Sequence, residues 1–246
     1  VHSSSSEEIG LRIEEMTMAK AVALISGGID SPVAAHLISK KMEIIPLHFF
    51  LHPFYCEVSF ELVMETLKAL RTKISFEKVV LYPWGETLSK IMSGQARRYM
   101  CVICRRGMFK AAELICDSTQ AEAIVTGESL GQKASQTLQN LSATSHCVKC
   151  PIIRPLIGLD KLEIERISRR LGIWREKHVG CCTATPSKPA TNTRIEVLDE
   201  LYERLNMQTH IENLFKRRLE MQIKSEGDLD RLYLLALERI STQRET

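Results

Sequence analysis

Residues 21–31 read AVALISGGIDS, and this stretch decides the fold. Its first five residues form an apolar run that predicts a buried strand, and the SGG that follows predicts a tight turn. Ser31 and Pro32 suit the N-cap and the first position of a helix. A glycine loop therefore joins the strand to the helix at the carboxyl end of the strand, where open parallel sheets bind their ligands.

The loop at residues 26–31 has the composition of a phosphate-binding loop. Its two glycines let the backbone turn sharply and approach an anion, and the amides at the helix start point toward that anion. Ser26 and Ser31 add donors, and we expect Asp30 to hold a magnesium ion on the phosphates. The alternative, a glycine turn that merely connects two elements, is disfavoured by this context. An ordinary P-loop NTPase is disfavoured because no G-x-x-x-x-G-K-[ST] occurs.

Further apolar runs predict four more strands, with helical patterns between them. The strands are expected at residues 44–50, 79–82, 121–126 and 151–156. One helix is expected to open at Asp160, with Glu163 completing a capping box, and to close at Gly172. Strands that alternate with helices predict an α/β fold: an open parallel five-stranded sheet with helices on both faces.

Three segments are expected along the chain. Residues 1–19 look like a short charged lead-in, and residues 20–194 hold the α/β domain. Residues 195–246 follow a helical period and contain no proline, so we expect a small helical appendage there.

The composition limits the function classes. The chain has 246 residues, 44% of them apolar, and a net charge of +3, so any RNA site must be a local basic patch. No apolar run approaches the roughly 20 residues of a membrane span. The polar N-terminus lacks the apolar core of a secretory signal. We therefore expect a soluble, cytoplasmic protein with no membrane association.

Eight cysteines require an explanation in a reducing compartment, where structural disulfides are rare. Six of them are clustered, at residues 101 and 104, 147 and 150, and 181 and 182. Cys116 continues an apolar helical face and is interpreted as a core residue. The two C-x-x-C pairs suggest one alternative, a four-cysteine zinc site made of Cys101, Cys104, Cys147 and Cys150.

Four segments resemble one enzyme family. SGGIDS at residues 26–31 resembles the PP-loop signature of enzymes that split ATP into AMP and pyrophosphate. VTGESLGQKASQT at residues 125–137, RPLIGLDK at 154–161, and CCT with the following prolines at 181–191 resemble the tRNA 4-thiouridine synthases, or tRNA uracil 4-sulfurtransferases. The resemblance covers roughly residues 20–193.

The resemblance implies an ATP site and a reaction. The implied ATP contacts, with the loop included, are Ala23, Leu24, Ser26, Gly27, Gly28, Asp30, Ser31, His48, Phe49, Arg105, Gly127 and Gln136. Without the resemblance, His48 would be interpreted as a strand-end histidine bonded to backbone, and Gln136 as a solvated helix residue. The implied reaction adenylates oxygen 4 of the uridine at position eight of tRNA, after which sulfur displaces AMP. Magnesium is required to neutralise the phosphates.

The resemblance also implies a metal cofactor. Cluster-dependent tRNA thiolases suggest that Cys101, Cys104 and Cys181 hold a 4Fe–4S cluster with one iron open to sulfide. Cys181 lies in the loop that the family uses for sulfur transfer, so we expect it, with Asp30, to be catalytic. The four-cysteine zinc site remains the alternative, with sulfur then passing through a persulfide on Cys181.

Partners follow from what the sequence lacks. The family usually carries an RNA-binding THUMP region, for which residues 1–19 leave no room, and many members add a rhodanese domain with a persulfide cysteine. We therefore expect tRNA as substrate, a separate RNA-binding partner, sulfide or a persulfide carrier as sulfur donor, and a homodimer. Basic candidates for RNA contact are Arg97, Arg98, Lys133, Lys188, Lys216, Arg217 and Arg218. Alternative functions are a PP-loop enzyme acting on a small molecule or another tRNA base, and a non-catalytic tRNA-binding scaffold.

Overall fold

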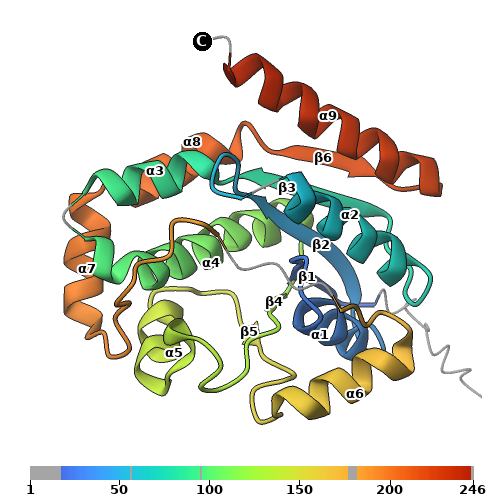
Figure 1. Ribbon diagram of the computed structural model, residues 1–246, viewed down its shortest axis with the longest axis horizontal. Coiled ribbons are helices and arrows are strands. Elements are labelled where there is room, and N and C mark those ends of the chain that lie inside the picture. Colours follow the sequence, from blue (N-terminus) through green and yellow to red (C-terminus); the bar gives the residue numbers. More distant parts are fainter. Residues whose placement is uncertain (1–17, 56, 95, 177–181, 245–246) are drawn as a thin grey trace, which may run out of the picture.

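The computed structural model describes residues 18–55, 57–94, 96–176 and 182–244, and its centre is a six-stranded sheet (Figure 1). The strands are β1 (Lys20–Leu24), β2 (Glu43–Phe50), β3 (Lys78–Pro83), β4 (Ala123–Val125), β5 (Ile152–Ile153) and β6 (Leu219–Gln222). Their order across the sheet is β5-β4-β1-β2-β3-β6, and every neighbouring pair is parallel except β3 and β6. The lead-in expected at residues 1–19 lies almost wholly outside the described residues.

Helices cover both faces of the sheet, as the sequence predicts (Figure 1). They are α1 (Asp30–Ile38), α2 (Glu57–Arg71), α3 (Gly85–Ser93), α4 (Met100–Thr119), α5 (Leu138–Ser145), α6 (Lys161–Leu171), α7 (Ile195–Arg204), α8 (Met207–Phe215) and α9 (Glu226–Arg244). Alternate strand residues face opposite sides: Val22 belongs to the core cluster that includes residues of α3, α4, α7 and α8, whereas Ala21 belongs to the cluster that includes residues of α1, α2, α6 and α9. Within the described ranges, none of the helices is both long and apolar enough to span a bilayer.

Local sequence signals explain where α6 begins and ends. The Asp160 side chain accepts from the Glu163 amide and the Glu163 carboxylate accepts from the Asp160 amide, both at 2.8 Å. Gly172 follows the helix with φ of 68°, a left-handed conformation that glycine adopts without strain. The capping box and the glycine stop predicted for this helix are both confirmed.

The sheet has six strands rather than the predicted five, and the helices expected within residues 195–246 are present. β6 arises within residues 195–246 and pairs antiparallel with the edge strand β3. Leu198, Leu201 and Ile211 of α7 and α8 are buried in the same core cluster as β2 and α4. The C-terminal segment is therefore part of the α/β unit, and a four-residue strand between helices was too short to interrupt the helical period.

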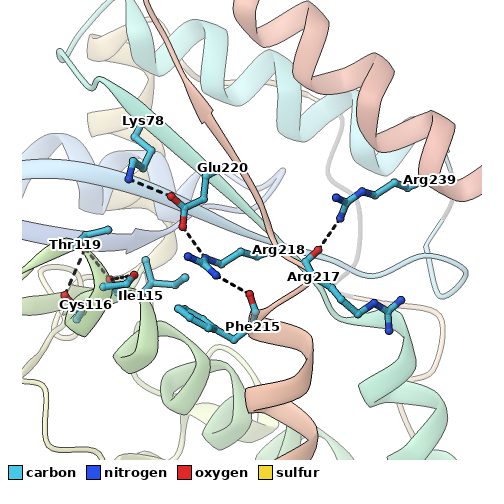
Figure 2. Close-up of polar contacts among 10 residues, drawn as sticks. Lys78, Ile115, Cys116, Thr119, Phe215, Arg217, Arg218, Glu220 and Arg239 are labelled. Carbon is cyan, nitrogen blue, oxygen red and sulfur yellow. Dashed lines mark hydrogen bonds and ion pairs between the residues drawn. The ribbon is translucent and has the colours of Figure 1, made fainter.

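Charged side chains hold β6 in place (Figure 2). Glu220 of β6 accepts from Lys78 of β3 at 3.1 Å and from Arg218 at 2.6 Å. Arg218 also donates to the Phe215 carbonyl at 2.8 Å, and Arg239 of α9 donates to the Arg217 carbonyl at 2.6 Å. Because a strand at a sheet edge has few partners, these contacts fix its position against β3.

Candidate active site

The glycine loop lies at the carboxyl end of β1 and borders a cavity of about 160 Å³. The ends of β2 and β4 and the first turns of α4 complete the wall, as expected for an open parallel sheet. Every residue of the predicted ATP set except Ala23 lines this cavity. Ala23 is buried in β1, in the core cluster that also contains residues of α1 and α2.

Two serines close the loop on itself. The Ser26 amide donates to the Ser31 hydroxyl at 2.9 Å, and the two hydroxyl oxygens lie 3.1 Å apart. The prediction of Ser31 as an N-cap is wrong, because α1 begins at Asp30 and its N-cap residue is Ile29. The Ser31 hydroxyl instead accepts the hydrogen bond from the Ser26 amide, so the last residue of the loop is joined to the first.

Gly127 is required by packing at the end of β4. A Cβ at this position would lie 2.7 Å from the Ser31 nitrogen and 2.7 Å from the Asp30 carbonyl carbon. Backbone atoms cannot give way as a flexible side chain can, so any larger residue would displace the loop. The structure thus adds a second reason for the glycine that the resemblance linked to close approach of nucleotide.

Asp30 forms an ion pair across the edge of the cavity. The Lys161 ammonium lies 2.8 Å from its carboxylate, with the two side chains 43% and 25% exposed. Lys161 is the first residue of α6, which the Asp160 cap positions. Lys161 was absent from the predicted site. Its position as a charged residue at the end of the RPLIGLDK segment was the signal that could have pointed to it.

Glu128 is a second residue that the sequence analysis missed. Its side chain is 1% exposed and lies between two guanidinium groups. Arg154 Nε donates to it at 2.8 Å, whereas Arg105 Nε lies 3.3 Å away, at ion-pair distance but without hydrogen-bond alignment. Two cations against one buried carboxylate leave a net positive charge at the cavity wall, which favours an anionic ligand.

The cavity presents hydrogen-bond acceptors that have no partner among the described residues. His48 shares a 2.9 Å hydrogen bond through Nδ1 with the Ile25 carbonyl, while its buried Nε2 has none. Burial lowers the pKa of His48 to about 4, so the ring is neutral near pH 7 and Nε2 is an acceptor. Gln136 is buried too, with its Oε1 unpartnered, so it is not the solvated helix residue of the alternative interpretation.

Cys101 and Cys104 lie in the first turn of α4, on one side of the helix as predicted. Cys104 is buried and accepts a hydrogen bond from Trp84 Nε1 at 3.2 Å, whereas Cys101 is half-buried. The segment after Cys182 lies nearby, because the Ala190 amide donates to the Arg98 carbonyl at 2.9 Å. Cys181, the third predicted ligand, lies outside the described residues.

The four-cysteine zinc site is not formed, and that alternative is wrong. The Sγ atom of Cys150 lies 3.4 Å from that of Cys116, and Cys147 is exposed. Cys116 and Cys104 are twelve residues apart in α4, about 18 Å along its axis. Throughout the part of the chain that the structure describes, no three His, Cys, Asp or Glu side chains are placed to hold a metal ion.

The basic residues expected to contact RNA divide into two groups. Arg217 is paired with Glu86 at 2.7 Å. Arg218 is paired with Glu220 (Figure 2). By contrast, Lys133 lines the cavity, and Arg98 lies beside the segment that leads away from Cys182. Cations at the cavity edge are therefore better placed for a bound polyanion than those at β6.

Comparisons with known proteins point to one family. The family model described as "Thiamine biosynthesis protein (ThiI)" matches residues 16–207. A probable tRNA sulfurtransferase of Methanothermobacter thermautotrophicus is 36% identical over 215 residues, which are 85% of this chain and 55% of that relative. One from Acetivibrio thermocellus is 40% identical over 194 residues, 77% of this chain and 50% of the relative.

A solved structure is also similar. The crystal structure of a 4-thiouridine synthetase–RNA complex with bound ATP matches with a TM-score of 0.76 and 32% identity. The match covers 82% of this chain and 54% of that one. The chain thus spans about half the length of the curated relatives it matches.

Proposed function

The chain belongs to the ThiI family, and from that premise we propose that it is the catalytic part of an ATP-dependent tRNA sulfurtransferase. The reaction converts a uridine of tRNA, at position eight, to 4-thiouridine. Uracil oxygen 4 attacks the α-phosphorus of ATP, a new P–O bond forms, and pyrophosphate leaves. Sulfur then adds at carbon 4 of the base, and the bond from that carbon to oxygen breaks with loss of AMP.

One observation carries this proposal. The glycine loop, held by the Ser26–Ser31 hydrogen bond, borders a cavity whose buried hydrogen-bond acceptors have no partner among the described residues. The loop amides at the start of α1 would bind the phosphates of ATP. His48 Nε2 and Gln136 Oε1 would accept hydrogen bonds from the adenine amine or the ribose hydroxyls. Arg105, on the positively charged wall, would contact phosphate.

Asp30 and Lys161 would share the charge of the triphosphate. Magnesium prefers carboxylate and phosphate oxygens, and Asp30 offers a carboxylate at the edge of the cavity beside the loop. When bound, magnesium neutralises phosphate charge during transfer. Lys161 now holds that carboxylate at 2.8 Å, and the same ammonium would be within reach of a phosphate that approaches the loop.

Cys101, Cys104 and Cys181 are the proposed ligands of a 4Fe–4S cluster. The donor set fits as far as it is described, because two thiols share one helical turn and the Trp84 N–H donates to Cys104. When bound, such a cluster supplies an iron without a protein ligand that can bind sulfide. The buried surroundings of Cys104 would keep water away from the sulfur.

The partners are proposed on the same basis. The similar synthetase was solved with RNA, and the relatives are tRNA sulfurtransferases by name. We propose that tRNA lies across the carboxyl edge of the sheet, near Arg97, Arg98, Lys133 and Lys188. A sulfide or persulfide donor, a separate RNA-binding partner and a homodimer stay predictions.

Product analysis tests this function. Anaerobically purified protein is incubated with labelled ATP, magnesium, sulfide and unmodified tRNA, and the tRNA is digested to nucleosides. We expect AMP and pyrophosphate in step with 4-thiouridine, together with iron and acid-labile sulfide in the protein. ADP and phosphate as main products would contradict the PP-loop assignment. AMP release with uridine nucleotides but not with tRNA would instead favour a small-molecule substrate.

A further inference from the structure

A second pair of cysteines lies far from the cavity. The Sγ atoms of Cys116, near the end of α4, and Cys150, just before β5, are 3.4 Å apart. Cys116 is 2% exposed, and Cys150 is half-buried. Because Cys116 is about 18 Å along α4 from Cys104, this pair is separate from the proposed cluster ligands.

The protein positions Cys150 through its backbone. The Glu113 carboxylate, one turn before Cys116, accepts from the Cys150 amide at 3.2 Å and from the Lys149 amide at 2.5 Å. Lys110 in turn pairs with Glu113 and donates to the Cys147 carbonyl at 3.0 Å. The segment that carries Cys150 is thereby held against the face of α4 that carries Cys116.

Access and reactivity favour one thiol of the pair. A cavity of about 460 Å³ opens beside both sulfurs, with Lys110, Lys149 and Asp117 also in its wall. The hydrogen bond between the two sulfurs lowers the pKa of the Cys150 thiol, and the same bond together with burial raises the pKa of the Cys116 thiol. Cys150 is therefore the thiol that ionises first and meets solvent.

We propose that Cys116 and Cys150 are a redox-active dithiol that closes to a disulfide on reaction with a small-molecule disulfide. The Cys150 thiolate attacks one sulfur of the reagent, forms a mixed disulfide and expels one thiolate. Cys116 then loses its proton and attacks the Cys150 sulfur, which expels the second thiolate. Two protein thiols are oxidised, and one reagent disulfide is reduced to two thiols.

Closing requires the sulfurs to approach from 3.4 Å to about 2 Å, a movement within the reach of side-chain rotation. The new bond joins α4 to the segment just before β5, a two-residue strand at the edge of the sheet. Within the described chain, β4 is the only strand that neighbours β5. The disulfide closes a loop of 33 intervening residues, which restricts the unfolded chain and raises stability. The disulfide form is thus the more stable one.

Oxidised glutathione is the probe, and Cys147→Ser is the matched control, since Cys147 lies three residues from Cys150 but is exposed. Treated protein is digested without reduction and analysed by mass spectrometry. We expect a linked pair of peptides containing Cys116 and Cys150, lighter by two hydrogen atoms, in both wild type and control. The melting temperature should rise by about 5 °C and return on reduction.

Two variants make the test independent of folding. In Cys116→Ala the resolving thiol is absent, so a glutathione adduct should persist on Cys150; in Cys150→Ser no linked peptide should form. A Cys147–Cys150 linkage would overturn the proposal, as would lasting glutathione on Cys150 in the wild type or a Cys116 that stays reduced while other thiols react.

Discussion

Two carboxylates, one in the loop after β4 and one in β6, each lie between two cations, and their surroundings differ. Glu128 lies between Arg105 and Arg154, is 1% exposed and faces the cavity beside the glycine loop. Glu220 lies between Lys78 and Arg218, is 27% exposed and belongs to the edge strand β6.

The difference shows how one charge pattern serves two purposes. Beside Glu128 the buried acceptors of His48 and Gln136 lack partners among the described residues, so the charges there surround space for a ligand. Around Glu220, Lys78 and Arg218 already donate hydrogen bonds to carboxylate and carbonyl oxygens of the chain itself (Figure 2). We therefore interpret the first group as a binding site and the second as the fastening of an edge strand.

The strongest test of the binding site is Asp30→Asn. The change keeps the size of the side chain but removes the charge that we propose holds magnesium, so AMP formation should fall roughly 10²–10³-fold. The melting temperature should change little, because Asp30 is exposed in part. Asp230→Asn on α9, another aspartate paired with a lysine, is the control and should keep full activity. Equal activity in the two variants would show that the Asp30 carboxylate takes no part in the reaction.

Glu128→Gln tests the buried member of this pair of carboxylates. The loss of one charge leaves the Arg105 and Arg154 guanidinium groups facing each other in a buried site, which costs about 3 kcal/mol of unfolding free energy. Urea denaturation measures the loss. Saturating ATP should restore part of the stability, since phosphate would supply the missing negative charge. A variant as stable as wild type would show that the pair of arginines is solvated.

The pH dependence of stability should report on His48. Its pKa is about 4 in the folded protein against an ordinary 6.5, so between these values the unfolded chain binds the additional proton. The stabilising contribution is full above pH 6.5 and is lost as the pH falls to about 4, by roughly 3 kcal/mol in total. His48→Asn should lack this component when urea unfolding is compared at pH 4.5 and 7.5. The same pH dependence in both proteins would contradict a buried neutral ring.

Glu220→Gln should have the smallest effect. Its partners are partly exposed, so the unfolding free energy should fall by less than about 1 kcal/mol. Affinity for tRNA and its dependence on salt should stay unchanged, whereas Lys133→Ala should reduce both. A filter-binding titration at several salt concentrations separates the two. If Arg218→Ala reduced the salt dependence of tRNA affinity, the cations around β6 would have to be counted among the residues that contact RNA.

Much of the fold was predictable because the signals are local. The core strands β1 to β4 are apolar runs, and the ends of α6 depend on Asp160, Glu163 and Gly172, which act within one helical turn. The glycine loop was recognised in the same way. The roles of the predicted ATP contacts stay predictions, although all of these residues except Ala23 line one cavity.

What the sequence alone determined is therefore the local framework: an α/β order of elements, a glycine loop at a strand end and a family. Only the tertiary structure decided which distant residues meet. It paired β6 with β3, placed Cys150 against Cys116 rather than Cys104, and packed Gly127 on Ser31. Periodicity and capping depend on neighbours three or four residues away, whereas these contacts depend on how the sheet brings separate segments together, and no local pattern encodes that arrangement.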